Sequence, residues 1–404
     1  MNAEDRALLL RAVQYHDVQA FSRFDSSFFE EDILLTDESS GAQLPLLAMG
    51  IREACTRRAG RMEIPYEWDD FLTFLVTHCH LDVNKPFEIR GRPSDISSKF
   101  PYTHKFQQEH SSVTPPIIDP SCLIHTNAFS WAFYTSLQKR KYIRGDYLSC
   151  IITLIYLGAN VNDPFLLQIS HGHMDPEGDL KWNALNGHSF LHLALESGSH
   201  LLLDRLLDKK AKFNLAHDRG SLAKAIANVK DILPKSFDLN YDIYYIFRHL
   251  KTYIESGHLD AAYRQVLRSA DPTNGNTPFH YLALLKDLRG SQFYVDFLLE
   301  IFVNPWARNH AGLTALQVLE STIMTSETPN KQALRKHIQD AMERWYDLVM
   351  RTMVTHEALQ ARRMPLEVQE ELARSVSGTF PMDGRMSQAA SMKARIMASR
   401  RKGP

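Results

Sequence analysis

Apolar residues recur at helical spacing in many stretches of this chain. Near the start, Leu9, Val13, Val18 and Phe21 follow one another at short intervals, which places them on one face of a helix. Similar spacing predicts helices over residues 44–55, 68–79, 128–139, 147–157, 201–207 and 241–267. After Thr328 and Pro329, a longer helix is predicted by an apolar stripe made of Leu334, Ile338, Ala341, Trp345, Leu348 and Val349. The pattern indicates a series of amphipathic helices.

Two segments interrupt the helical pattern. Six of the 18 prolines fall within residues 85–127, and each proline removes a backbone donor and restricts the residue before it. We therefore expect no long helix there and interpret 85–127 as a proline-rich insertion, partly disordered, that projects from the helices. It is either a tolerated surface loop or a functional one. Residues 164–182 form a second connector.

Short motifs that begin with glycine precede three of the apolar stretches. They read Gly187-His188-Ser189-Phe190-Leu191-His192, Gly275-Asn276-Thr277-Pro278-Phe279-His280 and Gly312-Leu313-Thr314-Ala315-Leu316-Gln317. In each, a serine or threonine can accept hydrogen bonds from the first N–H groups of a helix, and proline suits the first helical position because it has no N–H. Gly187 and Gly220 are 33 residues apart, whereas the next two intervals are 55 and 37, so the later modules carry insertions.

These motifs resemble the turn and first helix of an ankyrin repeat, most closely over 183–220 and 271–320. The resemblance implies an all-α fold: a solenoid of stacked helix-turn-helix pairs with a C-terminal capping helix. It would divide the chain into a degenerate repeat array over 1–325 that contains the 85–127 insertion, a helical cap over 326–375 and a basic disordered tail over 376–404.

The resemblance also implies roles for individual residues. The repeat motif positions are structural: glycines fit turns, cap residues start helices and histidines tie neighbouring turns together. These positions are Gly187, Ser189, His192, Gly220, Gly275, Thr277, Pro278, His280, Gly312 and Thr314. Partners bind such proteins through turn tips and the first helices, which makes five residues candidate contacts: His188, Arg219, Asn276, Trp306 and His310.

The charge distribution and the cysteines indicate what surroundings the protein has in the cell. The net charge is −1, and the tail 376–404 alone carries +5, so the remainder is mildly acidic at −6. The tail is either a solvated end or a basic amphipathic segment that docks on a partner or an anionic surface. A third interpretation, a nuclear-import signal at Arg400-Arg401-Lys402, rests on a cluster that is short for such a signal. The four cysteines form no C-x-x-C pair, which indicates reduced thiols in a reducing compartment. With neither a secretory signal nor a membrane span evident, we expect a protein of the cytoplasm or nucleus.

The sequence contains few clusters of residues that could bind a metal or carry out catalysis. His171, His173 and Asp175 gather two imidazoles and a carboxylate in one loop, yet their spacing matches no defined metal site. The sequence contains no phosphate-binding glycine loop, G-x-S-x-G or H-E-x-x-H motif. We therefore expect no enzyme activity and no cofactor, and instead a scaffold that binds protein partners of unknown identity. The alternative is a metal protein or enzyme that uses the 171–175 loop.

Overall fold

The computed structural model describes residues 3–24, 28–29, 33–36, 41–57, 70–91, 122–139, 145–170, 183–232, 239–257, 261–285, 288–323 and 328–355. The chain divides into two compact units, Met1–Pro272 and Thr273–Pro404, which are described separately. The 171–175 loop, the centre of the proline-rich insertion and the tail 376–404 lie outside the described residues.

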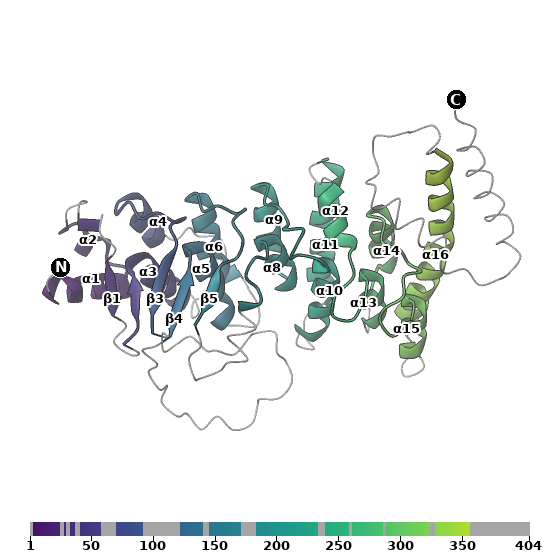
Figure 1. Cartoon of the computed structure of the whole chain (residues 1–404), viewed down its shortest axis with the longest axis horizontal. Helices are drawn as coiled ribbons and strands as arrows, with labels where there is room; N and C mark the ends of the chain where they lie inside the picture. Colours follow the sequence, from purple (N-terminus) through teal and green to yellow (C-terminus); the bar gives the residue numbers. More distant parts are fainter. Residues whose placement is uncertain are drawn as a thin grey trace, which may run out of the picture. The chain divides into compact units, whose positions relative to one another are not determined.

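The first unit is mainly helical. Its helices are α1 (Ala3–Tyr15), α2 (Val18–Phe21), α3 (Leu46–Arg57), α4 (Asp70–Thr77), α5 (Ala128–Lys139), α6 (Gly145–Tyr156), α8 (Phe190–Glu196), α9 (His200–Asp208), α10 (Ser221–Ile232), α11 (Leu239–Glu255) and α12 (Ala261–Arg268). Successive helices alternate between two rows, visible in Figure 1: α3 packs on α5 in one row, while α4 packs on α6 and α6 on α9 in the other. A helix pair therefore buries its apolar faces against the next pair.

The described residues of the first unit include five short strands. They are β1 (Leu34–Thr36), β2 (Gln43–Pro45), β3 (Phe87–Arg90), β4 (Leu123–Thr126) and β5 (Leu167–Ile169). All neighbours are antiparallel and the order in the sheet follows the chain, as Figure 1 shows. The strands lie in the connections between one helix pair and the next.

This sheet corrects the expected fold class: the protein is not all-α, and the architecture is helices with a five-stranded antiparallel sheet. Strands β3, β4 and β5 arise in the connectors, 85–127 and 164–182, that we expected to lack regular structure, and β2 includes residues 44 and 45, where we expected a helix to begin. Along β3 and β4, buried and more exposed positions alternate, which is the period of a strand with one covered face. The two ends of the 85–127 insertion pair with each other, with Phe87 opposite Thr126 and Arg90 opposite Leu123.

The β5 edge of the sheet is covered by side chains. Asn186 accepts from Leu167 N at 2.5 Å and donates to Leu167 O at 2.8 Å. Asn183 does the same for Ile169, at 2.8 and 3.1 Å. Two amide side chains thus take the place of a sixth strand, which satisfies backbone groups that would otherwise offer an edge for pairing.

The second unit contains α13 (Pro278–Leu284), α14 (Ser291–Glu300), α15 (Ala315–Ile323) and α16 (Pro329–Thr355). Helix α13 packs on α15, and α16 packs on α14 and α15. Of the stripe that predicted the last helix, Leu334, Ile338, Ala341 and Trp345 are buried. Within the described residues, every helix of either unit is too short or too polar to cross a membrane.

Candidate functional site

Three helices begin with the same local pattern, and the structure shows how each is held. In the second unit, Thr277 N donates to His280 Nδ1 at 3.2 Å, and the Thr277 hydroxyl contacts the same nitrogen at 2.8 Å. At the next helix start, Thr314 N donates to Gln317 Oε1 at 2.9 Å. In both cases the side chain three residues along reaches back to the cap, which is the geometry of a capping box.

His280 also reaches the following turn. Its Nε2 lies 2.9 Å from Leu313 O, and because a carbonyl only accepts, His280 must carry its proton on Nε2 and accept at Nδ1. Burial lowers the pKa of His280. The hydrogen bond to Leu313 O raises this pKa by a smaller amount, so the net shift is downward. The neutral imidazole therefore ties two turns together, as the motif predicts.

The glycines of these motifs adopt left-handed backbone conformations. Gly187 and Gly275 have φ of +88° and +73°, and Gly220 and Gly312 have +77° and +75°. At Gly275 a Cβ atom would come within 2.6 Å of the His310 ring, so both the backbone and the close approach of the next turn require glycine.

The motif at residues 187–192 is built differently, because Asp218 replaces the histidine at the cap. Ser189 N donates to Asp218 Oδ1 at 3.1 Å instead of to His192. Asp218 Oδ2 also accepts a hydrogen bond from Asn214 N at 2.6 Å, and Asp218 Oδ1 lies 3.0 Å from His188 Nδ1. Burial raises the pKa of Asp218, but the His188 hydrogen bond, the His192 charge and the bonds from Ser189 and Asn214 lower it to a net value below the ordinary one.

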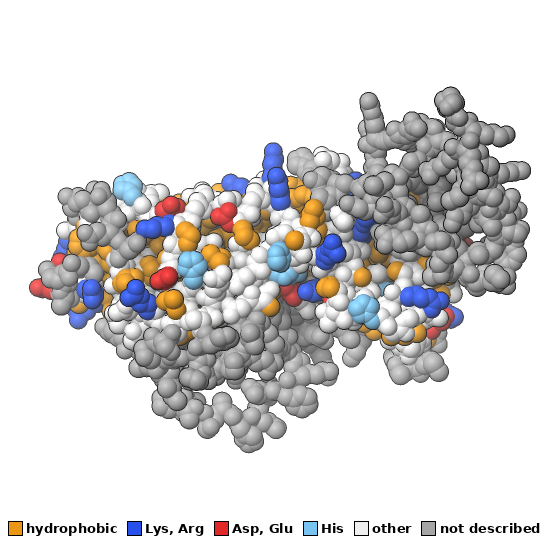
Figure 2. Space-filling model, in the orientation of Figure 1, with side chains coloured by type: hydrophobic (Ala, Val, Ile, Leu, Met, Phe, Trp, Pro, Cys, Tyr) orange, Lys and Arg blue, Asp and Glu red, His pale blue; other side chains and the backbone are white. Residues whose placement is uncertain are grey.

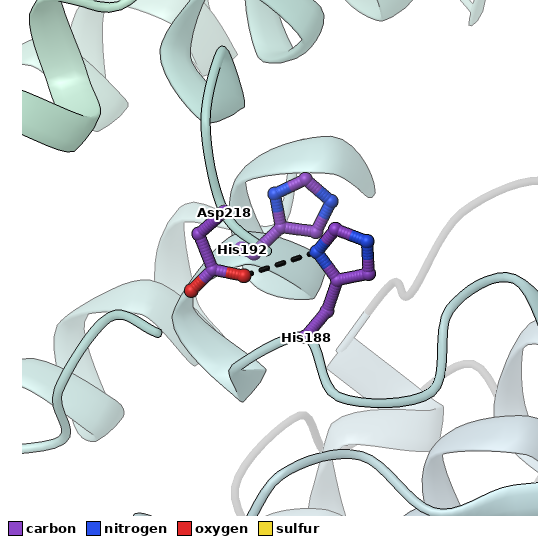
Figure 3. Close-up of side chains that lie close together, drawn as sticks. All are labelled: His188, His192 and Asp218. Carbon is purple, nitrogen blue, oxygen red and sulfur yellow. Dashed lines mark hydrogen bonds and ion pairs between the residues drawn. The ribbon is translucent and has the colours of Figure 1, made fainter. Parts of the chain in front are cut away.

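The His192 side chain therefore makes no bond to the cap N–H, and it lies in the interior with no exposed surface. Its Nδ1 is 2.7 Å from the Ser221 hydroxyl, and its Nε2 is 3.1 Å from Glu196 Oε2. The His188 ring stacks on it, with ring centroids 4.1 Å apart and planes 17° from parallel. Figure 3 shows this stacked pair, with His188 turned toward Asp218.

Within the described part of the chain, His188, His192 and Asp218 are the group that could share a metal ion, with donor atoms within 4.8 Å of one another. The hydrogen bonds described above, however, already engage Asp218 Oδ1, His188 Nδ1 and His192 Nδ1. A nitrogen lone pair lies in its ring plane, so two stacked, nearly parallel rings do not direct their lone pairs at one point. The geometry favours a hydrogen-bonded cluster over a metal centre.

Ser221, His192 and Glu196 follow the order of a nucleophile, a base and a carboxylate. Ser221 and His192 have no exposed surface, and the Ser221 hydroxyl donates its proton to Asp218 O. A substrate carbonyl cannot reach that oxygen, whereas nucleophilic catalysis requires access to it. This arrangement therefore supports packing of α8 on α10 rather than acyl transfer.

The five candidate contact residues have different surroundings. Arg219 and His310 are exposed. Asn276 is half-buried and accepts from Asn309 Nδ2 at 2.9 Å, and half-buried Trp306 donates its ring N–H to Met342 O at 3.0 Å. His188, with 13% of its side chain exposed, belongs to the Asp218 cluster. Of the five, the structure leaves Arg219 and His310 most open to a partner.

Two exposed leucines were missed by the sequence reasoning. Leu215, in the turn at residues 214–219, is 43% exposed, and Leu313, in the turn at residues 309–313, is 39% exposed. Each follows a glycine, asparagine or other turn-forming residue rather than a helical stripe, and that position is the signal that could have found them. On the face that Figure 2 shows, hydrophobic side chains are interspersed with acidic and basic ones.

Neither protein-family models nor curated protein sequences give a match to this chain. The ankyrin resemblance therefore rests on the motifs themselves, and the metal alternative at His171, His173 and Asp175 stays a prediction, since these residues lie outside the described ones.

Proposed function

We propose that this protein is a non-catalytic binding scaffold that recognises protein partners through its turn tips. The observation that carries the proposal is a pair of turns, 214–219 and 309–313, that are pinned by asparagines and each display one exposed leucine. The local likeness to ankyrin repeats, a family that binds proteins in this way, supports the same reading.

Hydrogen bonds of Asn214 fix the turn at 214–219. Asn214 Nδ2 donates to Gly187 O at 2.7 Å, Asn214 Oδ1 accepts from Ala216 N at 3.1 Å, and Asn214 N donates to Asp218. Leu215 is therefore presented on a fixed backbone with Arg219 nearby in the same turn. Because the loop is already ordered, binding would cost little conformational entropy.

The turn at 309–313 has the same construction. Asn309 Oδ1 accepts from Ala311 N and Leu313 N at 3.1 and 3.0 Å, and His310 N donates to Asn274 O at 2.9 Å. Leu313 is again the exposed apolar group, and the exposed residue His310 belongs to the same turn. A partner suited to either tip would offer an apolar socket with a polar rim, the usual anatomy of a protein interface.

The setting that we propose is intracellular, in the cytoplasm or nucleus. Cys79, Cys122 and Cys150 are buried and form no disulfide within the described part of the chain, and burial raises the pKa of Cys79 to about 12. Such thiols behave as small apolar core residues, a usage typical of reducing compartments.

Affinity purification with the full chain as bait, quantified by mass spectrometry, tests the proposal. We expect Leu215→Ser or Leu313→Ser to reduce capture of a specific partner about tenfold, the effect of losing a contact worth about 1.4 kcal/mol. Leu123→Ser is the matched control, because Leu123 is 36% exposed but lies on strand β4. Capture that is equal for all three variants and the wild type would contradict recognition through the turn tips.

A further inference from the structure

The hydrogen bonds around Ser221 fix the position of a proton on His192. Ser221 Oγ donates to Asp218 O, and a hydroxyl has only one hydrogen to donate. Ser221 must therefore accept in its 2.7 Å contact with His192 Nδ1, which requires a hydrogen on that nitrogen. A neutral imidazole carries a single N–H, so a neutral His192 would have a bare lone pair at Nε2.

That lone pair would face a carboxylate. His192 Nε2 is 3.1 Å from Glu196 Oε2, both atoms are buried, and no described residue gives either of them a well-aligned hydrogen bond. Two acceptors at this distance in the interior repel each other, and a buried polar atom without a partner is costly. The geometry lacks one hydrogen between these two atoms.

We propose that His192 and Glu196 form a buried imidazolium–carboxylate pair, whose additional proton is taken from solvent as α8 packs on α10. The proton lies on Nε2 and the imidazolium then donates twice, to Ser221 and toward Glu196. The pair makes the packing of α8 on α10 sensitive to pH.

The groups that face Glu196 favour its ionised form. Burial raises the pKa of Glu196, but its contact with His192 and the charges of His192, Lys224 and His188 lower it to a net value below the ordinary one. Lys224 lies on α10, and Asp218 and His217 lie in the preceding turn. Helix α9, which packs on α8, buries only leucines among its described residues: Leu202, Leu203, Leu206 and Leu207.

The direction of the pH effect follows from where the proton is bound. An unfolded histidine is mostly neutral above pH about 6.5, whereas the folded pair holds its proton. The folded state then binds one proton more than the unfolded state, so raising the pH favours unfolding. We expect the folding equilibrium constant of the first unit to fall about tenfold per pH unit from pH 7 until the folded pair releases the proton.

Glu196→Gln is the decisive variant. A glutamine amide can donate to Nε2 of a neutral His192, so the network closes without an additional proton. The expected pH slope is shallower than in the wild type by about one proton. Glu255→Gln is the matched control, because Glu255 pairs with Lys251 at the same i,i+4 spacing but is 59% exposed, and it should keep the wild-type slope.

The experiment combines pH-dependent urea unfolding with ¹⁵N NMR of histidine-labelled full-length protein, in which His192 is assigned from the His192→Gln spectrum. At pH 7.5, we expect both ring nitrogens of His192 to carry protons in the wild type and only Nδ1 in Glu196→Gln. A singly protonated His192 in the wild type overturns the proposal even if a variant fails to fold. A His192 signal that moves on treatment with a chelator also overturns it, because a metal would then occupy the place of the proton.

Discussion

The helix starts at Ser189 and Thr277 perform the same task with different acceptors. At Thr277 the cap N–H is accepted by a neutral histidine three residues along, whereas at Ser189 it is accepted by the carboxylate of Asp218. That exchange leaves His192 free to turn inward to Ser221 and Glu196. A residue 29 positions beyond the cap thus decides whether a motif histidine is a local cap or part of a buried charged cluster.

The contact between successive turns shows the same contrast. In the first unit it joins His188 to Asp218 at 3.0 Å, and in the second it joins Asn276 to Asn309 at 2.9 Å. One link involves an ionised carboxylate and the other involves two neutral amides. Since hydrogen bonds to charged groups are stronger and their loss leaves more buried groups unpaired, the first unit should depend more heavily on a single side chain.

The largest effect is expected from removing that carboxylate. Asp218→Ala leaves the N–H groups of Ser189 and Asn214 and the ring of His188 without their acceptor, and we expect a loss of about 3–5 kcal/mol of unfolding free energy. The matched change in the second unit, Asn309→Ala, removes neutral and partly exposed hydrogen bonds and should cost about 1–2 kcal/mol. Urea unfolding followed by hydrogen exchange, which reports on each unit separately, measures both.

Asp218→Asn serves as the control, because it keeps the size of the side chain and one acceptor oxygen. It should lie between the wild type and Asp218→Ala. Equal losses for Asp218→Ala and Asn309→Ala would remove the proposed difference between the two units.

A smaller effect is expected in the second unit on acidification. The folded state lowers the pKa of His280, mainly through burial, so the neutral form is favoured when folded. The resulting stability is fully present above the pKa of an unfolded histidine, about 6.5, and is lost as the pH falls from there toward the lowered folded value. Hydrogen-exchange protection of α13 should therefore decrease from pH 7 to pH 5.5.

His280→Gln tests the cause of that loss. Gln317 already performs the capping role at Thr314 with an amide oxygen, and glutamine does not titrate. The variant should lose some protection at pH 7 but little more at pH 5.5. An acid response that matches that of the wild type would assign the effect to another group.

How far the sequence predicted the fold depended on the period of each segment. The helices were predictable because apolar residues such as Leu202, Leu203 and Leu206 repeat along one helical face. The strands were not, because β3 and β4 are four residues each and their pairing joins segments on either side of a long proline-rich stretch. A period of two over so few residues carries little information without knowledge of the partner strand.

In the candidate site, the sequence predicted contacts within a repeat motif but missed those that depend on how the helices pack. The cap at Thr277 follows from residues three positions apart, whereas the link from His280 to Leu313 spans 33 residues and was expected from the ankyrin resemblance. The different arrangement at His192 could not be foreseen, because Asp218 and Ser221 reach the motif through packing of α8 on α10, although Glu196 lies four residues from His192 on the same helix. The ankyrin resemblance placed His188 among the candidate contacts, whereas its bond to Asp218 holds it largely inside.

The smallest expected effect compares the two cap side chains. Ser189 Oγ accepts from His192 N at 3.2 Å, so Ser189→Ala removes a backbone cap and should cost about 1 kcal/mol. In Thr277→Ala the lost hydroxyl shared its contact, His280 Nδ1, with the Thr277 N–H, so that nitrogen keeps a donor and the cost should be a few tenths of a kcal/mol smaller. Thermal unfolding of the two variants beside the wild type gives this order. If Thr277→Ala instead proves the more damaging change, the hydroxyl contact with His280 is the main support of the second motif, and the histidine-to-backbone bond is secondary.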